Sequence, residues 1–466
     1  MAENWAESTF TLLDSFGDKI CKPYSIPMVP EELCKGSEKA HEPKVVSIGP
    51  RFKGRKELVL MEKNKLSCMH FLLQRSLLLH GTLTTTREIL FYCMQSVSNL
   101  KSAIRTSYAE QIQLDSFDFG TIIQDACFLL ELLISQSTEW NSRLRSDSFG
   151  PSPATQLGNM EFILSDITLL ENQIPLFLLQ VLLTTLFPKH FKEMHAGITT
   201  DLVLSLFGYT HYSSSKSIPY NTSASTPDPI DASHILELVH SSFILSENNQ
   251  HIQQTSSVVD VDANKPIKRK RCATRLLAAG VTIVKSQDNS FIPKFSTGVL
   301  QIPRLCITQT MEASWRSFIA WELHINKWGK GVGIGMFTFR ALLFNDLICC
   351  ASDVQLLKNK EIIDDELGMS NHDLVYFFGS LTNGIDRGLA QSTYCDMIHA
   401  LNTYPAAASI IRFPIILWHY LGRFSEWLHG LTKFLKRGYN FAAALITLLT
   451  VIQTCYAILS YHYPKK

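Results

Sequence analysis

Two carboxylates beside an apolar run are the residues of this chain whose types and spacing come closest to a catalytic pair. Asp166 and Glu171 precede the apolar stretch 174–187, and paired carboxylates can act as general acid and general base. Their spacing of five places them well apart around a helix, and Pro175 favours a break at 171–173. With no third polar ligand nearby in the sequence, we expect both to hold backbone groups exposed by the break. An acid–base or metal role is the alternative.

Other catalytic and cofactor motifs do not fit the sequence. The glycine-rich segment 328–335 is not a phosphate-binding loop, because His324 and Gly331 stand where that motif requires a glycine and a hydroxyl residue. The histidines form no H-E-x-x-H and no zinc spacing with cysteine, and G-x-S-x-G does not occur. We therefore predict no catalytic residue, no cofactor and no metal, and expect that the protein is not an enzyme. An uncharacterised hydrolase that uses Asp166 or Glu171 is the alternative.

Composition excludes several classes of protein. Lys and Arg total 43 against 42 for Asp and Glu, so the net charge of +1 gives no basis for bulk nucleic-acid binding. Charged residues make up 18% of the 466-residue chain, compared with about 25% in an average soluble domain. The shortfall indicates that part of the chain does not face water. Eleven cysteines without a C-x-x-C disfavour a disulfide scaffold or zinc ribbon and are typical of a reducing compartment.

Hydrophobic periodicity predicts a mainly α protein: one large helical domain over 44–435, preceded by an extension over 1–43. A small β element is expected near 281–307, where short strand patterns alternate with turn residues. Polar compositions predict exposed loops at 209–232 and 246–265. Helical patterns cover 58–79, 86–114, 119–134, 162–187, 232–245, 314–323, 337–357, 372–381 and 391–435.

The C-terminal end predicts a transmembrane helix over 441–463. No Asp, Glu, Lys or Arg occurs from 438 to 464, and 23 helical residues span about 34 Å, enough for a hydrocarbon core of about 30 Å. Four basic residues between 423 and 437 precede the span and only two follow it, which favours a cytosolic location for the rest of the chain. A buried core helix is the alternative. We expect a single-pass membrane protein with a C-terminal anchor.

A set of short motifs in a fixed order resembles the plant domain of unknown function 247 family, which includes UPF0481-like membrane proteins. The ten residues 166–175 are the most specific match, and the resemblance covers the chain from about residue 44 to its end. The matching motifs are 46–50 (VSIGP), 61–65 (MEKNK), 105–108 (RTSY), 125–128 (DACF), 166–175 (DITLLENQIP), 273–276 (ATRL), 279–281 (AGV), Phe295 with Gly298, 302–303 (IP), 353–357 (DVQLL) and 450–454 (TVIQT).

The resemblance implies a mostly helical, membrane-associated plant protein with one C-terminal span. The resemblance implies no catalytic residue. Some grass members of the family are implicated as pollen-side determinants of self-incompatibility, which is a role in recognition. We therefore expect a membrane-anchored recognition or scaffolding protein in pollen–stigma signalling. Its expected partners are the lipid bilayer and another protein, itself membrane-bound. The loops 209–232 and 246–265 are predicted to set the choice of partner, with the stretch 309–339 as the alternative surface.

Overall fold

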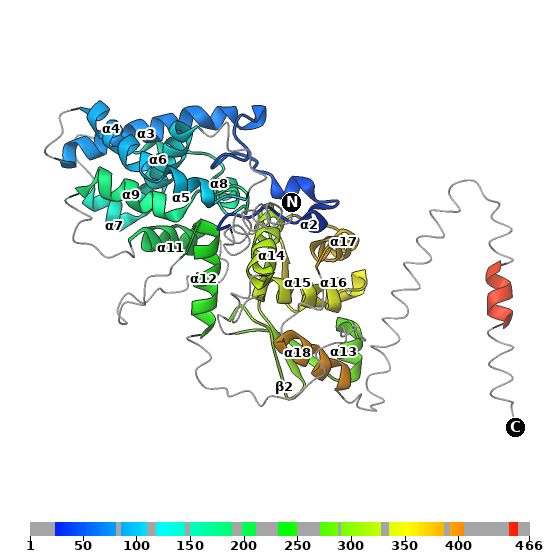
Figure 1. The fold of residues 1–466 in the computed structure, drawn as a ribbon. Helices are drawn as coiled ribbons and strands as arrows, with labels where there is room; N and C mark the ends of the chain where they lie inside the picture. Colours follow the sequence, from blue (N-terminus) through cyan, green and yellow to red (C-terminus); the bar gives the residue numbers. More distant parts are fainter. Residues whose placement is uncertain are drawn as a thin grey trace, which may run out of the picture.

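The computed structural model describes residues 24–80, 85–109, 118–144, 150–188, 198–210, 232–248, 271–287, 290–327, 335–385, 392–404 and 447–454. These residues form a mainly helical fold with two small sheets, which confirms the predicted class (Figure 1). A single hydrophobic cluster runs through it, from Ile26 to Leu401. In chain order the elements are α2 (Glu31–Cys34), η1 (Glu38–His41), η2 (Lys56–Leu58), α3 (Val59–His80), α4 (Thr86–Ser98), α5 (Lys101–Thr106), α6 (Phe119–Gln136), α7 (Thr138–Arg143), η4 (Pro153–Gln156), α8 (Met160–Asp166), α9 (Leu176–Leu186), α11 (Ile198–Thr210), α12 (Ile235–Asn248), α13 (Ala273–Ala279), β1 (Thr282–Lys285), β2 (Lys294–Ser296), β3 (Val299–Ile302), β4 (Leu305–Ile307), α14 (Met311–Lys327), α15 (Met336–Leu347), α16 (Ala351–Asn359), β5 (Ile363–Asp365), α17 (Asn371–Leu381) and α18 (Ser392–Thr403).

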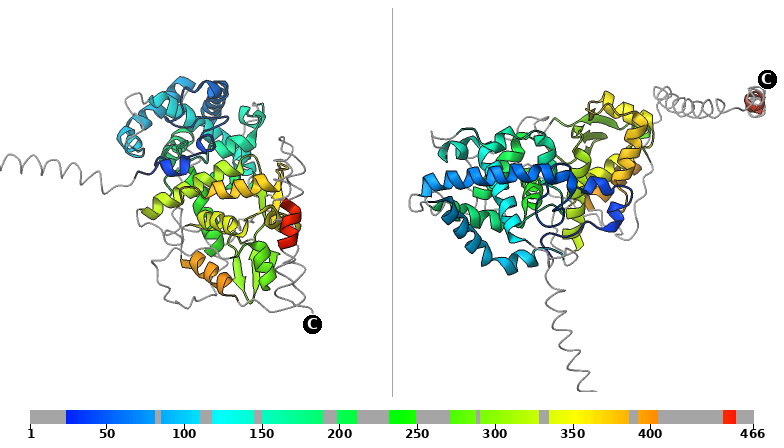
Figure 2. Two further views of the ribbon diagram at one scale, coloured as in Figure 1. Left: turned by 90° about the vertical axis from the view of Figure 1, so that its right-hand side faces the viewer. Right: turned by 90° about the horizontal axis from the view of Figure 1, so that it is seen from above.

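The N-terminal helices pack around α6. This helix is apolar on nearly every face and is covered by α3, α9, α11 and α4. α4 begins with a capping box, in which the Thr85 side chain accepts from the backbone N–H of Glu88 and the Glu88 carboxylate accepts from the backbone N–H of Thr85. Figure 2 shows α3 extending along one side of this group of helices.

The second half of the described fold combines helices with the two sheets. In the three-stranded sheet, β3 pairs in parallel with β1 and antiparallel with β2. β4 and β5 form a separate parallel pair. Beside them, the rings of Phe318 and Phe337 stack with centroids 4.2 Å apart and join α14 to α15. The sheets confirm the predicted β element near 281–307, and β5 adds a strand that the sequence patterns do not indicate.

Several predicted helices differ from the structure at their ends. The pattern over 337–357 forms two helices, because the backbone of Cys350 is extended (φ −155°, ψ 169°) and starts α16 anew. The pattern over 162–187 is divided as well, and the break predicted at 171–173 is confirmed, since α8 ends at Asp166 and α9 begins directly after Pro175. The predicted loops 209–232 and 246–265 lie outside the described residues except at their ends, where 209–210 and 246–248 are helical.

The predicted domain boundary at residue 44 remains a prediction. Residues 24–43 lie against the helical body: Ile26 donates its N–H to Ser107 O and its carbonyl accepts from Ala109 N. Ile26 and Leu33 are both part of the hydrophobic cluster. The predicted extension 1–43 therefore includes residues that contribute to the core.

One helix among the described residues is long and apolar enough to cross a membrane, and it is α6 rather than a C-terminal segment. Because 72% of α6 is buried inside the protein, its apolar surface is accounted for by core packing. Most of the predicted span 441–463 lies outside the described residues. Its described part, 447–454, is helical and exposed. The C-terminal anchor therefore stays a prediction.

Candidate functional site

Asp166 holds the backbone of residues 44–46, between η1 and η2. Its Oδ1 accepts from the N–H of Lys44 at 2.9 Å, and its Oδ2 accepts from Val45 and Val46 at 2.6 and 2.8 Å. The side chain is buried, and this burial raises the pKa of Asp166 to about 6 although the three N–H groups lower it. Both carboxylate oxygens of Asp166 therefore accept hydrogen bonds from the backbone of the chain itself.

Glu171, five residues after Asp166 in the motif 166–175, has a similar role. Its Oε1 accepts from the backbone N–H of Val29 at 2.8 Å, and its Oε2 accepts from Arg51 Nε at 3.1 Å. Both carboxylates therefore hold backbone groups, as expected, but the expectation that these groups are the ones exposed by the helix break is wrong. The groups that they hold come from residues 29–46 rather than from the helix break itself.

The side-chain amides of Asn172 and Gln173, in the same motif, stabilise the break between α8 and α9. Gln173 Nε2 donates to the carbonyls of Ile167 and Leu169 at 2.7 and 2.8 Å, and Leu169 O also accepts from the backbone N–H of Asn172. Asn172 Nδ2 donates to Val46 O, and its Oδ1 accepts from the N–H of Ile48 at 2.7 Å. The motif 166–175 thereby joins a turn between two helices to the extended segment 44–49.

A buried ion pair completes the connection. Lys65 Nζ lies 2.7 Å from Asp125 Oδ1 and also donates to Ser47 O, while Asp125 Oδ2 accepts from the N–H of Gly49 at 2.9 Å. Burial raises the pKa of Asp125 to about 6, and the nearby Lys65 ammonium opposes this shift. We call Lys65, Asp125, Asp166, Glu171, Asn172 and Gln173, with the backbone of 44–49, the motif network.

The motif network brings together five motifs that lie far apart in the sequence: 46–50, 61–65, 105–108, 125–128 and 166–175. Tyr108 belongs to it because its hydroxyl donates to Gln173 O. Raised carboxylate pKa values are a common mark of acid–base sites. Here both shifted carboxylates are buried and accept hydrogen bonds from the protein itself, so the geometry favours an architectural role.

Asp166→Asn and Glu171→Gln should each lower the free energy of unfolding by about 1–3 kcal/mol, because each replaces an acceptor oxygen by a donor that faces another donor. Denaturant unfolding followed by circular dichroism measures the loss. Glu57→Gln, at an exposed carboxylate, is the control and should change stability by less than about 0.5 kcal/mol. An Asp166→Asn protein that keeps full stability but loses a measurable turnover would support the hydrolase alternative.

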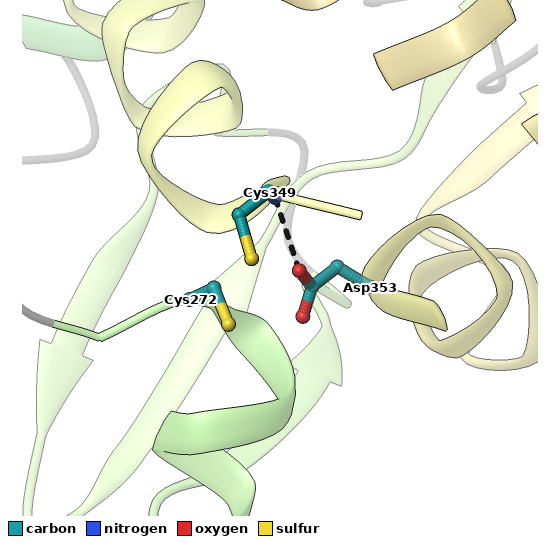
Figure 3. A group of neighbouring side chains, drawn as sticks. All are labelled: Cys272, Cys349 and Asp353. Atoms are coloured by element: carbon teal, nitrogen blue, oxygen red, sulfur yellow. Dashed lines mark hydrogen bonds between the residues drawn. The ribbon is translucent and has the colours of Figure 1, made fainter. Parts of the chain in front are cut away.

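A second group of reactive side chains lies where two helices begin. Cys272 is the N-cap of α13, Cys350 is the N-cap of α16, Cys349 precedes it, and Asp353 is in the first turn of α16. Figure 3 shows Cys272, Cys349 and Asp353 converging from these elements. The thiol sulfurs and a carboxylate oxygen of these three residues all lie within 4.8 Å of one another. We call Cys272, Cys349, Cys350 and Asp353 the thiol–carboxylate cluster.

Asp353 connects the two helix starts. Its Oδ1 accepts from the backbone N–H and the hydroxyl of Thr274 at 2.9 and 2.8 Å. Its Oδ2 accepts from the N–H of Cys349 at 3.0 Å, and Cys350 Sγ lies 3.4 Å from the same oxygen. Burial would raise the pKa of Asp353, but these donors hold it below the usual value.

The thiols affect one another's ionisation. The Cys349 thiol donates toward Cys272 and lowers the pKa of Cys272 to about 7, against the opposing effect of burial. The contacts with Cys272 and Cys350 raise the pKa of Cys349, and the contact with Cys349 lowers the pKa of Cys350. Helix N-termini also favour thiolates, so this is a place where a cysteine can be reactive at neutral pH.

Sequence reasoning missed this cluster, since Cys272 and Cys349 are far apart along the chain and form no C-x-x-C. One signal was available: the motifs 273–276 and 353–357 each follow closely after cysteines. A second group consists of Cys306 on β4, Asp364 on β5 and Glu366 directly after β5. It is more exposed, and its Asp364 already pairs with Arg304.

The outer face of α4 presents large apolar side chains to solvent. Phe91, Tyr92 and Met94 are 63%, 47% and 49% exposed, while Ile89 and Cys93 on the opposite face are buried. The rings of Phe91 and Tyr92 meet edge to face, with centroids 6.2 Å apart. Aromatic residues and methionine are enriched in protein interfaces, so this α4 face is a candidate contact surface.

The protein is mainly helical, and motifs that are separated in its sequence meet in one buried network of hydrogen bonds and an ion pair. Residues 26–450 match the family described as plant protein of unknown function, DUF247, and the chain belongs to that family. It is similar to a UPF0481 protein of Arabidopsis thaliana, with 25% identity over 98% of this chain and 90% of the relative. No solved structure matches it.

Proposed function

We propose that this protein is a membrane-anchored recognition or scaffolding protein that binds another membrane-bound protein. The observation that carries the proposal is the exposed α4 face of Phe91, Tyr92 and Met94. Large apolar side chains gathered on a surface helix mark a site that excludes water when a partner binds. The capping box at Thr85 stabilises the start of the helix that carries this face.

The hydrolase alternative has less support. It relies on Asp166 or Glu171, and both are buried and occupied by the backbone and side chains of the chain itself. A general base must reach the proton of a substrate within hydrogen-bonding distance. Neither carboxylate offers a substrate that access in the described structure.

The proposed anchor is the charge-free segment 441–463. The described turns within it, 447–454, are helical, and Leu448, Leu449, Val451 and Ile452 are exposed side chains that favour a lipid environment. An anchor confines the protein to a surface and raises its effective concentration for a partner in the same membrane. The grass members implicated in self-incompatibility support a partner of this kind, and pollen–stigma signalling is the setting we propose.

One experiment tests anchor and contact surface together: proximity labelling in native tissue, with membrane fractionation of each variant. The wild-type protein should resist carbonate extraction and label a defined membrane protein. Deletion of 438–466 should move the protein into the soluble fraction. Phe91→Asp with Tyr92→Asp should leave it in the membrane but reduce labelling of the partner at least about tenfold, the effect expected for a central aromatic contact.

Tyr376→Asp is the matched control, since Tyr376 is 77% exposed on α17 and lies outside the α4 face. It should label the same partner as the wild type. A truncated chain that stays in the carbonate-resistant pellet contradicts the single anchor. Undiminished labelling by the Phe91 and Tyr92 variant moves the contact surface elsewhere. The loops 209–232 and 246–265 are then tested by exchanging them with those of a close relative.

A further inference from the structure

We propose that the thiol–carboxylate cluster binds one thiophilic divalent cation of the Zn²⁺ class, with Cys272, Cys349 and Asp353 as ligands. In a tetrahedral site with metal–sulfur bonds of about 2.3 Å and metal–oxygen bonds of about 2.0 Å, the ligand atoms lie roughly 3.5–3.8 Å apart. The three ligand atoms of the cluster are within 4.8 Å of one another. A small contraction of side chains therefore suffices to form the site.

The chemistry of the donors selects the kind of ion. Two thiols and one carboxylate favour a borderline-soft ion such as Zn²⁺ over Mg²⁺ or Ca²⁺, which prefer oxygen ligands alone. Cys350 is a candidate for the fourth position, because its Sγ lies 3.4 Å from Asp353 Oδ2. Binding replaces the weak contact between this thiol and the carboxylate by a bond from each to the ion.

The carboxylate is already oriented as a metal ligand would be. Thr274 donates twice to Oδ1, and the backbone N–H of Cys349 donates to Oδ2. Such outer contacts fix the direction of a ligand and add to metal affinity. Asp353 is also fully buried, and within the described ranges no Lys, Arg or His forms an ion pair with it. Buried charges in proteins are paired or coordinate metals.

The consequence of binding would be structural. Cys272 belongs to the start of α13, and Cys349 and Asp353 to the start of α16, so one ion would join two helices that lie far apart in the sequence. Binding free energy at such a site adds to the free energy of folding. We expect that metal removal lowers the stability of the C-terminal half of the fold.

The test uses the full chain, purified with reductant and freed of metal by a chelator, and Co²⁺ as a spectroscopic probe. Titration should give thiolate-to-cobalt absorption that saturates at one equivalent per chain and disappears when Zn²⁺ is added. Cys272→Ser and Cys349→Ser should each weaken binding at least tenfold. Cys306→Ser should bind as the wild type does, which separates this cluster from the one on β4–β5.

Alkylation followed by mass spectrometry tests the same proposal without a substitution. Zn²⁺ should protect the partly exposed Cys349 of the wild-type protein from iodoacetamide, and a chelator should restore its labelling. Absence of protection, or cobalt binding that persists in the Cys272→Ser and Cys349→Ser double variant, overturns the proposal. So does a wild-type protein that, after full reduction, binds no cobalt and readily forms a Cys272–Cys349 disulfide.

Discussion

Replacing Lys65 by methionine should lower the free energy of unfolding by about 3–5 kcal/mol, because removal of one partner leaves a buried, uncompensated charge on the other. Both Lys65 and Asp125 are almost inaccessible to solvent, with side-chain exposures of 0% and 1%. Methionine has nearly the same volume as lysine, so little of the loss comes from an empty cavity. Denaturant unfolding followed by circular dichroism measures the change.

A double-mutant cycle isolates the charge effect. Adding Asp125→Asn to Lys65→Met removes the stranded carboxylate and should restore part of the lost stability. Lys53→Met is the control, since Lys53 pairs with Asp118 at the surface, where both side chains are well exposed. It should cost less than about 1 kcal/mol. A Lys65→Met protein as stable as the control would mean that the ion pair does not hold the motif network together.

The helical class and most helices of this fold follow from the sequence, because periodicity records which face each helix buries. The pattern over 119–134 predicts α6 closely, since its apolar run has no competing signal. The split between α15 and α16 could not be predicted in the same way. It depends on Cys350, whose extended backbone is accompanied by the bonds of Asp353 to Cys349 and Thr274.

The same limit applies to the candidate sites. A backbone-holding role for Asp166 could be predicted, because no other ligand lies near it in the sequence. Its actual partners, the N–H groups of residues 44–46, could not be, since only the tertiary fold brings them close. The thiol–carboxylate cluster was missed for the same reason. Strand β5 was missed because its short run, with two aspartates, shows no alternation and depends on pairing with β4.

The motif network also explains why a short glycine-containing motif is needed at 46–50. Gly49 has a φ of +77°, a region that costs other residues about 1–2 kcal/mol. A Cβ at this position would lie 2.5 Å from the backbone oxygen of Gln173 and 3.3 Å from the Tyr108 hydroxyl. The N–H of Gly49 also donates to Asp125. Any shift that relieves the contact therefore strains several bonds of the network at once.

Gly49→Ala should consequently lower the free energy of unfolding by more than about 3 kcal/mol, the sum of an unfavourable φ and a contact with fixed backbone. Gly54→Ala is the matched control, because Gly54 has nearly the same φ of +80° but nothing within 4 Å of the added methyl group. It should lose only about 1–2 kcal/mol. The difference between the two denaturation midpoints isolates the contact with Gln173. Equal losses would show that the segment 44–49 can move away from the motif 166–175 at little cost, and that the network is looser than its hydrogen bonds indicate.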